Sequence, residues 1–263
     1  MNAQRTVLVT CDINALVRIR EPAVAAVVLQ LEQQHGWLAP LAEAVENGRI
    51  EVRRTVLPGA SEAEIGRWLR QGIEVDTGLL DLKEALIADL MDLVALTRTI
   101  TGGERFVFRL FTEAPRRHCG YHVDTVAPGA PPWGLVRVYN GETTSYVDPA
   151  AVTSMSDFYR YLGRRERLVQ RAELEGDSLA QAETVCLDQA LPFVRDQRAV
   201  RSVPAGAVVA FTHVDAQEMF APSVTQSPWI HCSPMSGTVR LVVNISAARA
   251  PRRPPQAAAE RSH

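Results

Sequence analysis

Residues 117–124 read Arg-His-Cys-Gly-Tyr-His-Val-Asp and place a histidine, His122, two positions before a carboxylate, Asp124. Because side chains alternate along a β-strand, both groups would project from the same face of an extended segment. An imidazole and a carboxylate on one face are two thirds of the 2-His-1-carboxylate set that holds non-haem Fe(II). The stretch therefore calls for a fold that brings a second histidine from elsewhere in the chain.

His231 is the candidate for that second histidine, in the segment Trp-Ile-His-Cys-Ser-Pro of residues 229–234. It lies far enough down the chain from Asp124 for several strands to fit between them. A second His-x-Asp pair, His213 and Asp215, is an alternative, since this short motif has low specificity. That pair lies so close to His231 that only one hairpin fits between them, which favours the earlier pair.

Two other interpretations of these residues stay open. In the first, His122 and His231 are hydrogen-bonded core histidines and Asp124 is a turn or cap residue. In the second, Cys119 and Cys232 join the histidines in a zinc site. Because Cys232 directly follows His231, the two side chains would point to opposite faces of a strand, and the zinc site is disfavoured.

The strand predicted at 239–245 carries a charged residue on one of its faces. That face presents Arg240, Val242 and Asn244, whereas the residues between them are apolar and would face a core. A guanidinium aimed into a protein interior is costly unless an anion meets it. A dicarboxylate co-substrate held by a bidentate bond from Arg240 would supply that anion.

The composition is that of an ordinary globular protein and argues against several functional classes. The 263 residues suffice for one large domain or two small ones, and 46% are apolar. The net charge of −2 gives no reason to expect nucleic acid or an anionic membrane as a partner. No secretory signal or bilayer-spanning run is recognisable, so we expect a cytoplasmic protein. Four scattered cysteines predict reduced thiols, not a disulfide framework.

The first part of the chain, residues 1–103, is expected to be a mainly helical layer packed on a β core. Ser61 and Glu64 form a capping-box pattern, which predicts a helix start at that point. Helices are predicted at 23–33, 37–47, 62–71 and 79–96, and short strands within 6–20 and at 50–57.

The second part, residues 104–246, contains short β-branched or aromatic runs typical of strands. A charged, amphipathic insert at 156–191 predicts two helices that break near Gly176. Residues 247–263, rich in proline and arginine, predict a disordered tail. This order predicts an α+β fold in which helices flank an antiparallel sandwich or barrel.

The blocks around the candidate ligands resemble the bacterial DUF1826 family. The resemblance covers residues 13–245 and is sharpest at 109–141, at 203–207 and at 231–234 followed by the Arg-Leu-Val-Val that begins at Arg240. It implies a relationship to the cupin-like Fe(II)/2-oxoglutarate oxygenases. The fold so implied is a double-stranded β-helix, a jelly-roll or cupin-like barrel, preceded and flanked by helices.

On this resemblance, His122, Asp124 and His231 look like the iron ligands, and Arg240 looks like the 2-oxoglutarate anchor. The common oxygenase pattern Arg-x-Ser is here Arg-Leu-Val, so the usual serine partner of the co-substrate carboxylate is missing. The remaining residues predicted at the site are Tyr139 and Asn244 for the co-substrate, and Asn140, Thr143, Thr144 and Trp229 for the substrate.

The sequence thus predicts a non-haem Fe(II)- and 2-oxoglutarate-dependent oxygenase that hydroxylates or otherwise oxidises a C–H bond. Its partners would be molecular oxygen and a small polar, amino-acid-like or natural-product substrate, and a homodimer is an open alternative for its assembly. One alternative function is an Fe(II) oxygenase of the same fold that does not use 2-oxoglutarate, in which Arg240 binds the substrate's own carboxylate. Another is a non-enzymatic cupin-like module that holds a divalent metal.

Overall fold

A seven-stranded sheet forms the centre of the computed structural model, which describes residues 5–31, 36–115, 120–220 and 228–249. All neighbouring strands in this large sheet are antiparallel except the first two, which are parallel. In spatial order the strands are β1 (Thr6–Thr10), β2 (Val24–Leu29), β9 (Val208–Thr212), β6 (Trp133–Val138), β12 (Arg240–Ala247), β4 (Phe106–Glu113) and β3 (Thr55–Ala60).

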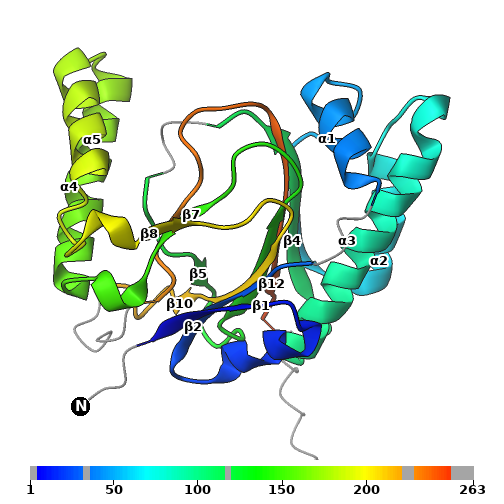
Figure 1. Cartoon of the computed structure of the whole chain (residues 1–263), viewed down its shortest axis with the longest axis horizontal. Coiled ribbons are helices and arrows are strands. Elements are labelled where there is room, and N and C mark those ends of the chain that lie inside the picture. The colour runs from blue at the N-terminus through cyan, green and yellow to red at the C-terminus, as the bar shows by residue number, and fades with distance from the viewer. Residues whose placement is uncertain (1–4, 32–35, 116–119, 221–227, 250–263) are drawn as a thin grey trace, which may run out of the picture.

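Three helices cover one face of the large sheet (Figure 1): α1 (Leu38–Glu46), α2 (Glu62–Gly72) and α3 (Leu80–Thr101). The predicted capping box is present at the start of α2, where Ser61 and Glu64 each accept a hydrogen bond from the other residue's backbone amide. Gly102 ends α3 with a φ of 67°, in the left-handed region that favours glycine. The helices predicted at 37–47, 62–71 and 79–96 are confirmed.

The apolar face of β12 packs against these helices, as its alternation predicts. Leu241, Val243 and Ile245 are fully buried in the same core as Phe106 and Phe108 of β4. The opposite face of the large sheet is not covered by these helices and can therefore line a binding site.

Two small sheets lie on that opposite side. One has the order β11-β7-β8 and the other pairs β10 with β5. Their strands are β11 (His231–Cys232), β7 (Ser145–Val147), β8 (Val200–Ser202), β10 (Val214–Asp215) and β5 (Thr125–Val126).

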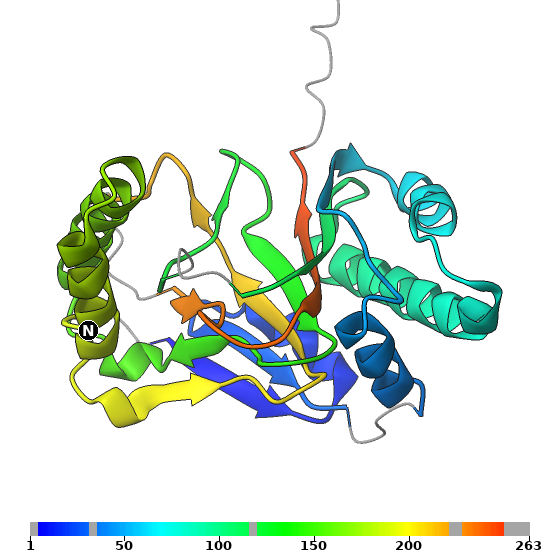
Figure 2. The same ribbon diagram turned by 90° about the horizontal axis from the view of Figure 1, so that it is seen from above.

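The helical insert packs beyond the small sheets as a pair of helices, α4 (Met155–Leu174) and α5 (Ser178–Ala190). Asp177 caps α5 directly after Gly176, so the predicted break is confirmed. Seen from above, the insert and the α1–α3 group lie at opposite ends of the molecule, with the strands between them (Figure 2). Four short 3-10 helices complete the described elements: η1 (Ile13–Arg20), η2 (Thr77–Leu79), η3 (Pro149–Ala151) and η4 (Gln197–Ala199).

Two sequence-based expectations need correction. The helix predicted at 23–33 is wrong, because residues 24–29 form β2, an interior strand buried at every position. A strand covered on both faces has a continuous apolar run that periodicity cannot distinguish from a buried helix. The expected closed barrel is also absent, since β1 and β3 are unpaired edges of the large sheet as far as the described residues extend. The fold is mixed α+β with a large open sheet.

The expected division of the chain at residue 103 is crossed by this sheet, because β1, β2 and β3 join it from the N-terminal side. At the other end, Ala247 is still the last residue of β12, and the tail predicted from there falls outside the described residues from 250 onward. Among the helices that are described, none is both long and apolar enough to cross a bilayer.

Candidate metal centre

His122, Asp124 and His231 converge on one point between the large sheet and the β11-β7-β8 sheet. The His122 Nε2 atom lies 3.6 Å from Asp124 Oδ1, and the His231 Nε2 atom lies 3.9 Å from Asp124 Oδ2. One ligand atom from each residue lies within 4.8 Å of the other two. The described residues contain no other group of histidine, cysteine and acidic side chains with this spacing.

Backbone hydrogen bonds bring the two histidines together. The His122 amide donates to the His231 carbonyl at 2.8 Å, and the His231 amide donates back to the His122 carbonyl at 3.0 Å. The residues are thus directly opposed in an antiparallel bridge, and their rings lie 4.4 Å apart between centroids. Cross-strand neighbours project from the same face, so both imidazoles face the carboxylate.

The histidine rings are oriented by their second nitrogen. His122 Nδ1 lies 2.8 Å from the Gly120 carbonyl oxygen, and His231 Nδ1 lies 3.1 Å from the Trp229 carbonyl oxygen. A carbonyl only accepts hydrogen bonds, so each Nδ1 carries the proton and each Nε2 presents a lone pair toward Asp124. Metal-ligating histidines are commonly fixed in this way. The core-histidine interpretation accounts for the Nδ1 bonds but not for the convergence of the Nε2 atoms.

Asp124 is held from the large sheet. Asn244 of β12 donates from Nδ2 to Asp124 Oδ2 at 3.4 Å, and Arg109 of β4 donates from Nη1 to Asn244 Oδ1 at 3.2 Å. Burial acts to raise the pKa of the Asp124 carboxyl, but the nearby imidazoles of His231 and His122 and the Arg109 guanidinium outweigh it and lower the pKa below 3.8. The carboxyl is therefore ionised, as a metal ligand must be.

The histidine of β11 is suited to binding metal at neutral pH. Burial lowers the pKa of His231 from 6.5 to about 4. A buried imidazole resists protonation because the charged form loses its hydration. His231 is thus a neutral donor at physiological pH, which is the form that coordinates a metal.

A cavity of about 390 Å³ opens at these three residues. The large sheet forms the floor of the pocket. The floor residues are alternate positions of its strands, whose side chains point away from the helical core. These floor residues are Arg109, Phe111, Val136, Val138, Arg240, Val242 and Asn244. Arg240, Val242 and Asn244 therefore share the pocket face, as the alternation of β12 predicts.

Of the other residues predicted at the site, Arg240, Asn244 and Thr144 line the pocket. Arg240 also donates from Nη1 to the Glu142 carbonyl at 3.3 Å. Trp229 lies behind the site, where its ring stacks on His231 at 4.2 Å between centroids and at 17° between planes. It supports a candidate ligand and does not line the cavity.

Three predicted residues lie away from the cavity. Tyr139 projects from the helical face of the sheet, and its hydroxyl donates to Asp89 of α3 at 2.6 Å. Asn140 bonds the backbone of Val239 and Leu241 next to β12, at 2.8 Å in each case. The Thr143 hydroxyl donates to the Val203 carbonyl at 2.5 Å. These side chains hold strands and loops together, so their predicted binding roles are not supported by their positions.

The second His-x-Asp pair does not form a ligand set. His213 lines the pocket, but Asp215 accepts hydrogen bonds from the backbone amides of Gln217 at 2.8 Å and Gly129 at 3.4 Å, as a turn residue does. The zinc alternative is also weakened, because Cys232 packs in the apolar cluster that includes Val147 and Ile230, on the side of β11 away from the cavity. Cys119 lies outside the described residues.

Two arginines at the pocket were not among the predicted site residues. Arg109 interrupts the otherwise apolar run Phe-Val-Phe-Arg-Leu-Phe of β4, which is the signal that could have identified it. Arg54 precedes β3, and its guanidinium lies over the Phe111 ring at 4.4 Å from the centroid. Nothing local in the sequence distinguishes Arg54 from other exposed arginines.

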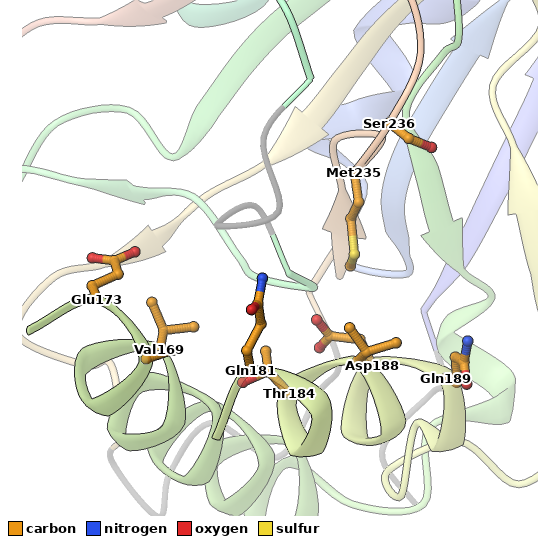
Figure 3. A pocket seen from close by; sticks show the side chains of 10 residues that line it. Val169, Glu173, Gln181, Thr184, Asp188, Gln189, Met235 and Ser236 are labelled. Carbon is orange, nitrogen blue, oxygen red and sulfur yellow. The ribbon is translucent and has the colours of Figure 1, made fainter. Parts of the chain in front are cut away.

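A second cavity of similar volume lies between the helical insert and the turn after β11 (Figure 3). Its wall includes Val169 and Glu173 of α4, Thr184 and Asp188 of α5, and Met235. The lining contains no histidine and none of the three candidate ligands. The chemistry-bearing groups therefore gather in the first cavity.

Comparisons with solved structures give weak likenesses. The rice dioxygenase for auxin oxidation aligns with a TM-score of 0.44 and 10% identity over 95% of this chain and 84% of its own. The dioxygenase for auxin oxidation 1 from Arabidopsis thaliana, in a binary complex with 2-oxoglutarate, aligns with a TM-score of 0.42 and 8% identity over 93% of this chain and 92% of its own. Comparison with curated proteins gives no match. Residues 10–243 match the family described as "Protein of unknown function (DUF1826)", and the chain belongs to that family.

Proposed function

We propose that the protein is a non-haem Fe(II) oxygenase that uses 2-oxoglutarate to oxidise a C–H bond of a small molecule. The observation that carries the proposal is the convergence of two Nε2 lone pairs and one ionised carboxylate at the opening of a cavity. Two histidines and one carboxylate on one side of a metal, with room left on the other, are typical of Fe(II) oxygenases.

The donor set fits a single ion. Metal bonds to nitrogen and oxygen are about 2.0–2.2 Å long, so donors at right angles on one face of an ion lie about 3 Å apart, and three atoms within 4.8 Å of one another need to move only a little closer to bind one ion. The His122 side chain is 37% exposed, which leaves its ring room to turn toward the other two ligand atoms. Closed structural zinc sites use four protein ligands, whereas a set of three leaves coordination positions open for reactants.

The arrangement of the cavity supports a co-substrate that carries two charges. Arg240 lies on the floor strand that also carries Asn244, four residues or about 13 Å along the strand from the level of Asp124. Its guanidinium would bind the far carboxylate of 2-oxoglutarate, while the near end of that molecule reaches the metal. When bound, iron and 2-oxoglutarate would together activate molecular oxygen.

The protein's own residues would hold and shield this chemistry. The carbonyls of Gly120 and Trp229 keep the Nδ1 protons in place, and Asn244 orients the Asp124 carboxylate. Val136 and Val138 make part of the floor apolar, which limits access of water to the reacting groups.

We further propose that the large sheet and the β11-β7-β8 sheet are the two halves of a double-stranded β-helix. The cavity lies between strands of the large sheet and the His122–His231 bridge, which is where such a fold would place its ligands. The seven-stranded sheet extends that arrangement with β1 and β2 at one edge and β3 at the other.

Metal analysis and turnover test the proposal. Protein reconstituted anaerobically should hold one Fe(II) and, on admission of oxygen, convert 2-oxoglutarate to succinate. Asp124→Asn should abolish both properties, whereas the matched control Asp215→Asn, in the second His-x-Asp pair, should keep them. If the wild-type protein does not bind a divalent metal more tightly than Asp124→Asn does, the proposal is wrong.

Arg240→Gln tests the co-substrate separately. It should weaken 2-oxoglutarate binding by about tenfold or more and leave metal binding intact, because a charge-assisted bond is lost far from the ligands. Iron-dependent oxygen consumption that does not need 2-oxoglutarate would favour an oxygenase of another type. A tightly held zinc ion with no oxygen consumption would favour a metal-binding module.

A further inference from the structure

We propose that Arg109 and Arg54 form a second anion-binding subsite, which holds the carboxylate of a small substrate whose remaining body is apolar. This inference rests on the proposed function, because it assigns Arg240 to the co-substrate. It goes further by assigning two arginines that the co-substrate does not need.

The two arginines lie toward the β3 edge of the cavity floor, on strands other than the one that carries Arg240. Arg109 is in β4, and Arg54 precedes β3, the edge strand that pairs with β4. Because strands are about 4.8 Å apart, the start of β3 lies about 10 Å across the sheet from β12, which carries Arg240. Arg109 is only one strand from β12, but it lies opposite Asn244, four residues or about 13 Å along β12 from Arg240, so an anion held there would not overlap with one held at Arg240.

The charges that line the cavity do not balance. Three arginines and a single carboxylate, Asp124, line it, and Glu113, which lies outside the lining, is paired with Arg54. A divalent metal adds two positive charges and bound 2-oxoglutarate removes two, so the excess of arginines over carboxylates in the lining persists in the loaded site. A substrate with an anionic group would reduce this excess.

The contacts of the two arginines indicate where that group binds. Arg54 is already paired with Glu113 at 3.1 Å, and its side chain is 65% exposed, so it lies at the mouth of the cavity. Arg109 bonds the uncharged Asn244, and none of the described carboxylates forms an ion pair with it. Arg109 is therefore the main anchor, and Arg54 is the second cation beside it. One such anchor predicts a substrate with one negative charge.

The rest of the cavity predicts the rest of the substrate. Phe111, Val138 and Val242 form an apolar row across the floor, between Arg240 on one side and Arg109 with Asn244 on the other, and Val136 adjoins Asn244. The volume of about 390 Å³ is at the low end for small-molecule sites, which span about 300–1,000 Å³. Since part of it must hold the co-substrate, the substrate is a small acid with an aliphatic or aromatic body, and a chain that bears several polar groups would not fit as well.

Binding of simple acids and their uncharged amides tests this subsite. Hexanoate and benzoate, with hexanamide and benzamide as matched neutral probes, are titrated calorimetrically into the metal-free protein and into protein loaded anaerobically with Fe(II) and 2-oxoglutarate. We expect at least one acid to bind about tenfold more tightly than its amide, because a charge-assisted hydrogen bond to a guanidinium is lost in the amide.

Variants then locate the binding. Arg109→Gln and Arg54→Gln should each weaken the acid, with the larger effect at Arg109, whereas Arg53→Gln, next to Arg54 but outside the cavity lining, should change nothing. Arg109→Lys should recover part of the affinity because it restores the charge. Thermal melting confirms that each variant is folded, and the exposed position of Arg54 keeps the test valid if Arg109→Gln is unstable.

The outcomes separate the two proposals. Acid binding that depends on Arg109 in protein that fails to bind 2-oxoglutarate would support the subsite and refute the proposed co-substrate. Equal binding of acids and amides, no binding of either acid at millimolar concentration, or loss of acid binding in Arg240→Gln but not in Arg109→Gln would overturn the subsite.

Discussion

Removal of one buried arginine in the helical insert should weaken both the fold and the candidate metal centre. Arg165 of α4 donates from Nε to both carboxylate oxygens of Asp188 in α5, at 2.8 and 3.0 Å, and Tyr161 donates its hydroxyl to the same carboxylate at 2.6 Å. The Tyr161 oxygen in turn accepts the Tyr121 amide at 3.2 Å. This cluster therefore connects the insert to the residue directly before His122.

The exposed fractions determine the expected loss of stability. The side chains of Arg165 and Asp188 are only 8% and 5% exposed, so Arg165→Gln leaves a buried carboxylate without its countercharge. Breaking a buried ion pair by removing one partner costs about 3–5 kcal/mol in the free energy of unfolding. The same substitution at Arg160, whose side chain is 74% exposed in its pair with Asp157, should cost less than about 1 kcal/mol.

The effect on the candidate metal centre follows from a backbone contact. A Cβ atom at Gly120 would lie 1.9 Å from Arg165 Nε, so the guanidinium packs directly on this residue, whose carbonyl orients His122. Loss of an outer partner of a metal ligand typically weakens metal binding by about 10- to 100-fold. Arg165→Gln should therefore bind Fe(II) at least about tenfold more weakly than wild type, while Arg160→Gln should bind it normally.

Urea unfolding of the metal-free proteins and anaerobic metal titration of the folded ones measure the two effects separately. The unfolding curves give the free-energy difference between Arg165→Gln and its control on the same helix. If the two variants are equally stable and bind metal alike, the insert does not support His122, and this reasoning is refuted.

Three further predictions concern the metal-free fold. Gly134→Ala should lose about 1–3 kcal/mol of unfolding free energy in urea, because its Cβ would lie 2.1 Å from Cε1 of the buried His213. His213 has a pKa of about 4 in the fold and 6.5 when unfolded, so its contribution is complete above pH 6.5 and is lost as the pH falls toward 4. Between pH 7 and 5 the unfolding free energy should fall by about 2 kcal/mol on account of this residue. His213→Gln should remove that part of the fall, and a variant whose unfolding free energy depends on pH as the wild type's does would contradict the prediction. On the helical face, Arg137→Met should cost about 3–5 kcal/mol by leaving Asp89 without its buried partner, and adding Asp89→Leu should restore most of the loss in the same assay.

The directions of several candidate site residues were predictable because they depend on local rules. The two-residue period of a strand places Arg240, Val242 and Asn244 on one face, and the structure has them on the pocket floor. The spacing of His122 and Asp124 likewise indicates a shared direction, and their atoms lie 3.6 Å apart. The spacing of residues along a strand indicates which face of that strand each side chain occupies.

Side chains near a motif were harder to assign because proximity in sequence does not determine the face. Tyr139 lies two residues after Arg137 in sequence, and both project toward α3, where they meet Asp89. The same alternation that sends Val136 and Val138 into the cavity sends these two away from it. The error at β2 has a related cause, since its apolar run contains no polar residue to reveal the period.

The support of the candidate metal centre is a property of tertiary structure. β11 has only two residues, and His122 belongs to an isolated bridge, so few backbone hydrogen bonds fix the ligands. Larger groups fix them: Trp229 stacks on His231, and Tyr121 packs edge-on against Phe193 in the aromatic core of the insert. An isolated hairpin with so few hydrogen bonds would be only marginally stable. Part of the rigidity at the candidate ligands therefore comes from α4 and α5, which makes the insert part of the site's construction although it lines none of the candidate metal cavity.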